Sequence, residues 1–405
     1  MNDEGDFVRG LMLLLTSRVD ECEAHFAKRL SDDNAPSHIR VRSMFGHSLV
    51  AVVRGLITFE DEDKNEALSR LQTTQKLVQS SLVPLTGSWF SFGGGSNNNG
   101  AAQDRNQAAL ENLDLELVGA DAGLFLAMIQ FTQESAMGIM RGALTLRKSY
   151  KVYQKALKEV TELQTSVSGK EGTGRQKRED SLATADVPPP AIRPESHWTS
   201  TKVVLDEDEL FFDASPTEED SLGGDIATGY GPLISRERTV MDRVIASSKM
   251  GTGLFHLVFS LIPARFASMI GTAMGFESTA DRSKGLRYLR YCVEQGTSRA
   301  PLAALVLLGF HSAMLILARG VADDADSREA FRVLEECLRQ YPDSPLFRFF
   351  EGRLYRGRGK LQKACESFEI AQKCSRNIHQ LAYLCICEFA FIGHHCHETN
   401  SSTFR

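Results

Sequence analysis

Apolar and small residues recur along this 405-residue chain at the spacing of paired helices. Ala330 and Leu334 stand about one helical turn apart, and Ala364 and Phe368 repeat this small-then-large order 34 residues later. A small side chain lets two helices approach closely, and the large side chain one turn away fills the space between them. The pattern therefore predicts helix–turn–helix units with these residues at the contact between two helices.

A period of 34 residues is typical of tetratricopeptide repeats, whose helical hairpins stack into a superhelix. The same order occurs 45 residues before Ala330, at Gly285 and Leu289, which indicates a longer helix or connection in that unit. Cys22 and Ala67 are separated by the same 45 residues, each with a large apolar residue four positions later. We expect nine residues to pack between the helices of the C-terminal repeats: Gly285, Leu289, Ala330, Leu334, Gly352, Tyr355, Ala364, Phe368 and Ala371.

Stretches with apolar residues at helical spacing alternate with stretches that lack this spacing, which predicts six segments. These are N-terminal helical pairs over 1–83, a flexible Gly- and Asn-rich loop over 84–105, a long helical pair over 106–160, an acidic linker over 161–232, tetratricopeptide-like repeats over 233–392 and an irregular tail over 393–405. The linker is rich in Ser, Thr, Glu, Asp and Pro, so we expect it to be largely disordered and to split the chain in two. The predicted fold is an all-α superhelix interrupted by this linker.

Charge and cysteine content limit which classes of function and which cellular compartments fit the sequence. The formal net charge of −6 argues against sequence-independent nucleic-acid binding, which needs positive charge to meet phosphate. Seven of the eight cysteines lie at or after Cys292, several on apolar helix faces, and no secretory signal pattern opens the chain. We therefore expect a reducing, cytosolic compartment. The pattern contains no catalytic constellation, so we predict neither enzyme activity nor a cofactor.

One apolar stretch leaves two interpretations open. Residues 301–318 contain no formal charge and approach the length of a membrane span. A buried helix of the repeat array is favoured because His311 and Ser312 lie in its middle. A membrane span is the alternative.

Three segments together resemble the tetratricopeptide repeat protein 39 family, whose fungal members are known as inclusion-body clearance proteins. They are residues 140–154, 255–276 and 281–289. The resemblance covers about 1–160 and 235–392. It implies an all-helical repeat protein without known catalytic residues, linked to lipid and sterol homeostasis and to the clearance of inclusions or lipid droplets. After Phe391 the expected second helix of the last pair is missing from the pattern, which predicts an uncovered apolar face.

The acidic linker contains a short candidate binding motif. Four acids at 206–209 lead into Leu210 and then Phe211, Phe212, Asp213 and Ala214. This resembles the two-phenylalanines-in-an-acidic-tract motif, which binds a receptor domain at the endoplasmic reticulum. Leu210 and Pro216 depart from the acids that such motifs prefer at these positions. A solvated acidic tract without a partner is the alternative.

A second cluster combines Cys385 and Cys387 with the His- and Cys-rich residues 394–397. Its spacing differs from that of known structural zinc sites, and two residues separated by one position point to different faces of a helix. We therefore interpret the cysteines as core residues and expect no metal site.

Taken together, the sequence predicts a non-enzymatic scaffold with protein partners, among them a membrane receptor of the endoplasmic reticulum. Membrane contact would then be indirect, with the protein in the cytoplasm at the surface of the endoplasmic reticulum, a lipid droplet or the outer mitochondrial membrane. The alternative is a protein that itself associates with the outer mitochondrial membrane or a lipid droplet through its apolar stretches.

Overall fold

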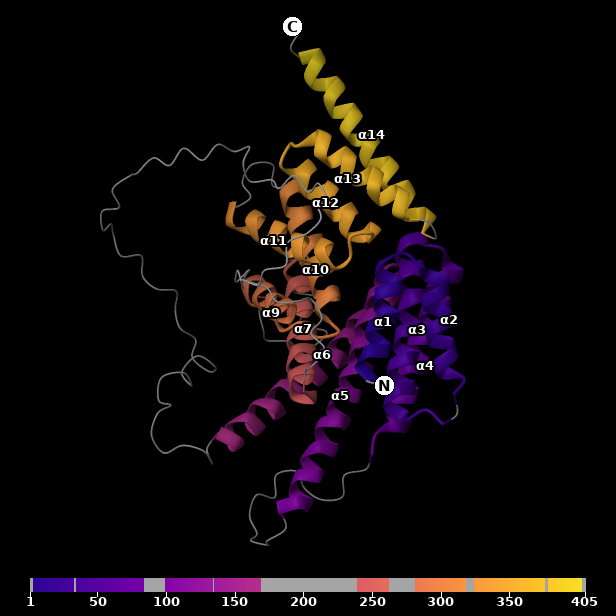
Figure 1. Cartoon of the computed structure of the whole chain (residues 1–405), viewed down its shortest axis with the longest axis vertical. Helices are drawn as coiled ribbons and strands as arrows, with labels where there is room; N and C mark the ends of the chain where they lie inside the picture. Colours follow the sequence, from indigo (N-terminus) through magenta and orange to yellow (C-terminus); the bar gives the residue numbers. More distant parts are fainter. Residues whose placement is uncertain are drawn as a thin grey trace, which may run out of the picture. The chain divides into compact units, whose positions relative to one another are not determined.

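The computed structural model describes residues 3–83, 99–168, 239–261, 281–317 and 324–402, apart from residues 33, 134, 376 and 377. Across these ranges the chain forms thirteen α-helices and no strand (Figure 1). The predicted all-α fold is confirmed.

The helices follow one another as hairpins. In the first part of the chain the pairs are α1 (Asp3–Leu15) with α2 (Val19–Leu30), α3 (Ser37–Thr58) with α4 (Asp61–Ser81), and α5 (Asn99–Phe131) with α6 (Ala136–Ser168). In the second part they are α7 (Val240–Leu261) with α9 (Arg282–Gln295), α10 (Ala300–Leu317) with α11 (Asp324–Gln340), and α12 (Pro345–Gly357) with α13 (Leu361–Cys374). A further helix, α14 (His379–Ser402), follows the last pair.

Three helices extend beyond the segments expected from the sequence. Helix α5 begins at Asn99 inside the expected loop, α6 continues to Ser168 inside the expected linker, and α14 continues to Ser402, so residues 393–402 are not irregular. No proline interrupts these extensions, and adding a residue to an existing helix costs far less than starting one. The apolar pattern therefore ends before the helices do.

The second helix of every hairpin carries the same pair of buried residues, a small one followed four positions later by a large one. The pairs are Cys22 and Phe26, Ala67 and Leu71, Ser149 and Tyr153, Gly285 and Leu289, Ala330 and Leu334, and Ala364 and Phe368. The small–large pair thus also occurs in α6, as Ser149 and Tyr153, where the sequence pattern did not predict it.

The last hairpin shows how this pair holds two helices together. The Phe368 ring of α13 lies over Gly352 of α12, where an added Cβ atom would stand 2.5 Å from the ring. The Phe349 ring is 5.7 Å from the Phe368 ring between centroids. Gly352 leaves no room for any larger residue, so this glycine sets the spacing of the two helices.

Between α7 and α9 a direct backbone approach accompanies the large side chain, because Leu289 lies 3.4 Å from the Cβ position of Gly253. A Cβ atom added at Gly253 or at Gly285 would lie 2.9 Å from the carbonyl oxygen of the other glycine. Two glycines facing each other let the helix backbones touch, which no pair of side chains would permit. Gly285 therefore has the close-packing position that its place in the register predicts.

The two folded regions on either side of the linker form one compact unit, comprising Met1–Leu163 and Tyr230–Arg405. Helix α7 packs against α5 as well as α9. The Tyr150 ring of α6 stacks on Phe255 of α7, with centroids 3.8 Å apart. The linker therefore does not divide the chain into two independent folding units.

Helix α10 contains most of the apolar stretch that allowed a membrane interpretation. It packs against α9, α11 and α12, and Ala303, Ala304, Leu307 and Leu308 belong to the buried core there. Within the described parts of the chain, no helix combines the length and the apolar character that a membrane crossing needs.

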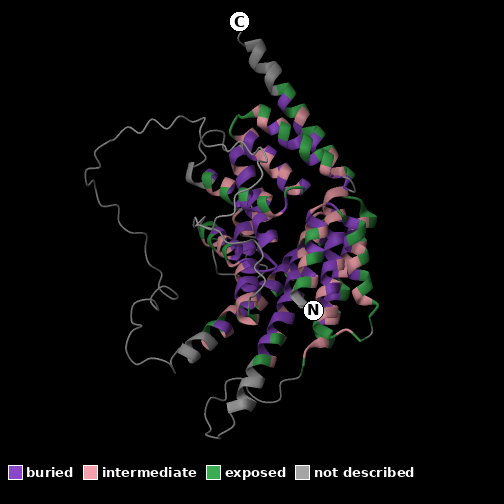
Figure 2. Cartoon of the chain, viewed as in Figure 1, coloured by how far each residue is buried: buried purple, intermediate pink, exposed green. Residues whose placement is uncertain are grey.

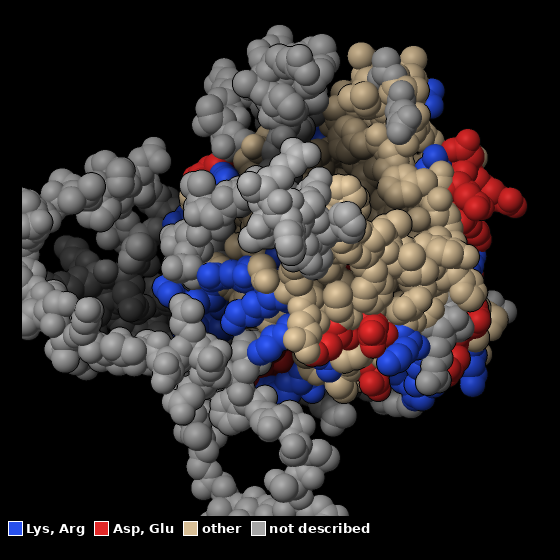
Figure 3. All heavy atoms as spheres, turned by 90° about the horizontal axis from the view of Figure 1, so that it is seen from above, with Lys and Arg blue, Asp and Glu red and all other residues tan. Residues whose placement is uncertain are grey.

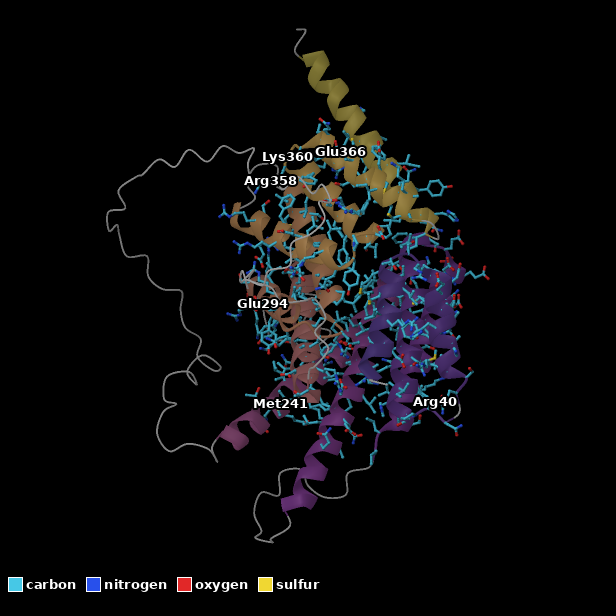
Figure 4. The ribbon with its side chains drawn as sticks, viewed as in Figure 1. Arg40, Met241, Glu294, Arg358, Lys360 and Glu366 are labelled. Atoms are coloured by element: carbon cyan, nitrogen blue, oxygen red, sulfur yellow. The ribbon has the colours of Figure 1, made fainter. Side chains whose placement is uncertain are left out.

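Ala364 offers a direct check of the register. Ala364→Arg should lower the free energy of unfolding by several kcal/mol, because Ala364 is 0% exposed and a long charged side chain would enter the α12–α13 contact. Glu366→Arg is the matched control, since Glu366 lies exposed on the same helix (Figure 4). Urea denaturation of both variants measures the difference, and equal stabilities would show that Ala364 does not lie in that contact.

Candidate functional site

The nine predicted packing residues lie inside the repeats, in α9, α11, α12 and α13, and all are buried. These residues therefore hold the helices of the repeats together and are not accessible to a binding partner. The four residues of the linker motif, Phe211, Phe212, Asp213 and Ala214, lie outside the described residues.

One side of helix α14 packs against the preceding hairpin. Leu381, Cys385 and Ile392 are buried and spaced as one face of a helix, and α14 contacts both α12 and α13. The Phe389 ring packs against Phe368, with 6.0 Å between centroids. The small–large contact of the last hairpin therefore also positions α14.

The opposite side of α14 is apolar and exposed (Figure 2). Tyr383 is 66% exposed, Leu384 44%, Ile386 46% and Phe391 67%. Cys387 and Ala390 are exposed between them. At about 100° per residue, these six side chains cover roughly 160° of the helix circumference without a charged residue. We call these six residues the α14 face.

The repeat register explains why this face is apolar. Tyr383 and Ile386 stand 34 residues after Phe349 and Gly352. In α12 those two positions contact Phe368 of the following helix. The α14 face is therefore the side on which the next helix of a repeat array would pack.

An ion pair between α12 and α14 borders the α14 face. Glu388 is 8% exposed and forms an ion pair with Arg356, and the Arg356 guanidinium lies 5.9 Å from the centre of the Phe391 ring. Figure 3, seen from the α14 end, shows a broad uncharged surface between groups of basic and acidic side chains. The Arg356–Glu388 ion pair thus lies at the edge of the α14 face, and the six residues of the face carry no formal charge.

Cys385 and Cys387 point to different sides of α14 and do not form a chelating pair, and the interpretation of both as core residues is wrong for Cys387. Cys385 is 0% exposed, and burial raises the pKa of its thiol to about 12, whereas Cys387 is exposed on the other side. The described residues contain no group of three or more His, Cys, Asp or Glu side chains arranged to hold a metal ion. The side chains of residues 395–397 lie outside the described part of the helix.

A buried ionic network connects the two regions of the chain. The Oδ2 atom of Asp121 in α5 accepts a hydrogen bond of 2.8 Å from Nε of Arg299, just before α10. Its Oδ1 atom accepts one of 2.8 Å from the Tyr153 hydroxyl of α6. Burial raises the pKa of the Asp121 carboxyl, and Arg299 and Tyr153 oppose that shift.

Asp114 extends the network about two turns along α5. It accepts from Nη2 of Arg42 in α3 at 2.5 Å and from Nη2 of Arg243 in α7 at 3.4 Å. Burial disfavours the charged form, but the two guanidinium groups outweigh it, so the pKa of Asp114 lies below its ordinary value. Buried ion pairs thus join helices from the regions before and after the linker.

The network fits a structural role. Both oxygens of Asp121 are occupied by donors within the fold. The adjoining cavity, lined in part by Arg42, Arg243 and Arg299, measures about 10 Å³, which is room for about one water molecule. A substrate of ordinary size does not fit there.

Sequence reasoning missed this network. Asp121 and Arg299 are 178 residues apart, and no local pattern relates them. The available signal was an acidic residue at a position that the helical periodicity of α5 assigns to the core, since such a residue needs a buried partner.

Arg299→Met tests whether the pair joins the two regions. The substitution should lower the free energy of unfolding by about 3–5 kcal/mol, because Asp121 would remain buried without its cation. Loss of Arg299 raises the pKa of Asp121 further, so the cost should shrink as the pH falls and the carboxylate becomes protonated. The double variant Asp121→Asn with Arg299→Met should recover most of the loss. Urea denaturation at neutral and mildly acidic pH measures both effects, and wild-type stability in Arg299→Met would contradict the pairing.

Comparison with known proteins identifies the family of this fold. No solved structure matches the chain. The family model described as Iml2/Tetratricopeptide repeat protein 39 matches residues 8–403, which include every helix from α2 to α14 in full and α1 from Val8 onward. This chain of stacked helical hairpins belongs to the Iml2/tetratricopeptide repeat protein 39 family.

Proposed function

We propose that the protein is a non-enzymatic scaffold that binds a helix of a partner protein on the α14 face. The observation that carries this proposal is the uncharged, exposed face of α14 at the positions where α12 packs against α13. Large exposed apolar patches on folded proteins are typical of interaction sites. Membership of a tetratricopeptide-type family supports the same class of function.

The register also defines the partner's chemistry. Helix α13 covers α12, and on one side it presents a small, a large and a small residue, namely Ala364, Phe368 and Ala371. Because Ile386 stands at the position of Gly352 and already fills that space, a partner helix would need a small residue over Ile386 and could place a large residue beside Tyr383. Arg356 at the border would favour an acidic residue near the end of the partner helix.

A helical peptide with the sequence of α13 is the probe that tests this surface. We expect a stapled peptide of residues 361–374, with both cysteines replaced by serine and Phe368 by alanine to leave room for Ile386, to bind with a dissociation constant on the order of 10 µM. Ile386→Glu should weaken binding at least tenfold, because it places a charge in the contact. Met140→Glu, an exposed apolar position on α6, is the matched control and should leave the affinity unchanged. Fluorescence titration decides between these outcomes, and no saturable binding to the intact chain would refute the proposed surface.

We propose in addition that the linker motif engages a receptor domain at the endoplasmic reticulum. The acids at 206–209 steer the segment to a basic surface, and Phe211, Phe212, Asp213 and Ala214 form the contact. This second contact would hold the scaffold at a membrane surface without inserting it.

A peptide of residues 204–221 tests the motif separately from the α14 face. It should bind the receptor domain with a dissociation constant on the order of micromolar, and added salt should weaken binding. Phe212→Ala and Asp213→Ala should each remove most of the affinity. Titration of the labelled peptide at low salt measures this, and a flat titration would favour a solvated acidic tract without a partner.

The cellular role that we propose follows from the family. A scaffold with one partner on α14 and a second at the endoplasmic reticulum is suited to lipid and sterol homeostasis or to the clearance of inclusion bodies and lipid droplets. Its partners would be proteins, and it would work from the cytoplasmic side of these surfaces.

A further inference from the structure

Helix α6 presents a second exposed face that the scaffold function does not use. One side of its first turns exposes three large apolar side chains: Met137 is 59% exposed, Met140 60% and Leu144 52%, while Ile139, 40% exposed, lies on another side. At about 100° per residue, the three lie within roughly 60° of one another around the helix. The opposite side of α6 packs against α5 and α7 through Leu146, Tyr150 and Tyr153.

The same face continues as a row of lysines. Lys148, Lys151, Lys155 and Lys158 are exposed and follow the three apolar residues along one side of α6. Between Ala136 and Lys158 the sequence has six Lys and Arg residues and no Asp or Glu, although the whole chain has a formal net charge of −6. We call Met137, Met140, Leu144 and the four lysines the α6 face.

Part of this positive charge is not neutralised by neighbours. Lys155 pairs with Glu116 of α5 at 3.0 Å, and Lys158 lies 3.9 Å from Glu162. Lys148 and Lys151 form no ion pair with any residue that the structure describes. The middle of the α6 face therefore carries free cations next to exposed apolar side chains.

This combination matches the chemistry of a lipid bilayer with anionic headgroups. Lysines attract the headgroups, and their long stems extend along the interface while apolar side chains beside them enter the acyl boundary. The face is a single convex helix of roughly 30 Å, which a bilayer accepts without a complementary pocket. A protein partner would need a groove that matches both the apolar and the basic part.

We infer that the α6 face docks the protein on membranes that contain anionic phospholipids. Met137, Met140 and Leu144 enter the bilayer interface, and Lys148 and Lys151 contact the headgroups. This contact is peripheral, involves neither α10 nor the α14 face, and does not depend on the proposed partner helix.

Vesicle co-sedimentation with the full chain tests the inference. Vesicles of phosphatidylcholine with about 30 mol% phosphatidylserine should retain at least tenfold more protein than vesicles of phosphatidylcholine, and raising the salt from about 50 to 500 mM should release most of it. Lys148→Glu with Lys151→Glu should abolish the preference for anionic vesicles. Met140→Ser with Leu144→Ser should weaken retention severalfold and make the remainder more sensitive to salt.

Matched variants separate this result from the scaffold proposal. Ile386→Glu on α14 should bind anionic vesicles like the wild type, and circular dichroism should show that the α6 variants keep their helix content. Wild-type retention by Lys148→Glu with Lys151→Glu, or equal retention on neutral vesicles, would overturn the inference. So would failure of the wild type to bind anionic vesicles while polyglutamate captures it through the same lysines, because that outcome indicates an acidic protein partner.

Discussion

The structure depends on one repeated contact, in which a large side chain of one helix occupies the space left by a small residue of another. Phe368 over Gly352 is the clearest case, and the facing glycines Gly253 and Gly285 bring the backbones of α7 and α9 together. Because the large residue is followed and preceded by small ones on the same helix, each hairpin has one preferred spacing. Hairpins with equal spacing stack, and stacking gives the superhelix its regular core.

The same contact accounts for the candidate interaction surface. Helix α14 follows the last hairpin, and its buried side packs mainly against α13 and also contacts α12 and α3. Its other side has the composition of a surface to be covered. The affinity of this surface for a helix therefore follows from the repeat geometry, and no pocket or catalytic group is needed for it.

The two exposed faces differ in the physical forces on which they depend. The α14 face is uncharged and should bind mainly by removing apolar area from water, so salt should affect it little. The α6 face combines a few apolar side chains with unneutralised lysines, so its binding should weaken as salt screens the charges. A scaffold with both faces could hold a partner protein while it rests on a membrane, and salt dependence distinguishes the two contacts in a single preparation.

The sequence by itself determined the helical class, the 34-residue register and the burial of residues such as Leu289, Ala364 and Phe368, because these properties follow from local periodicity and from residue size. The sequence did not indicate the pair Ser149 and Tyr153. The buried Tyr153 hydroxyl needs a hydrogen-bond acceptor, and that acceptor is Asp121 of another helix. The tertiary structure decided that the regions before and after the linker form one unit, joined by α5, α7 and the Asp121–Arg299 ion pair. No local pattern can carry that information, because a buried charge shows its need for a partner but not which distant residue supplies it.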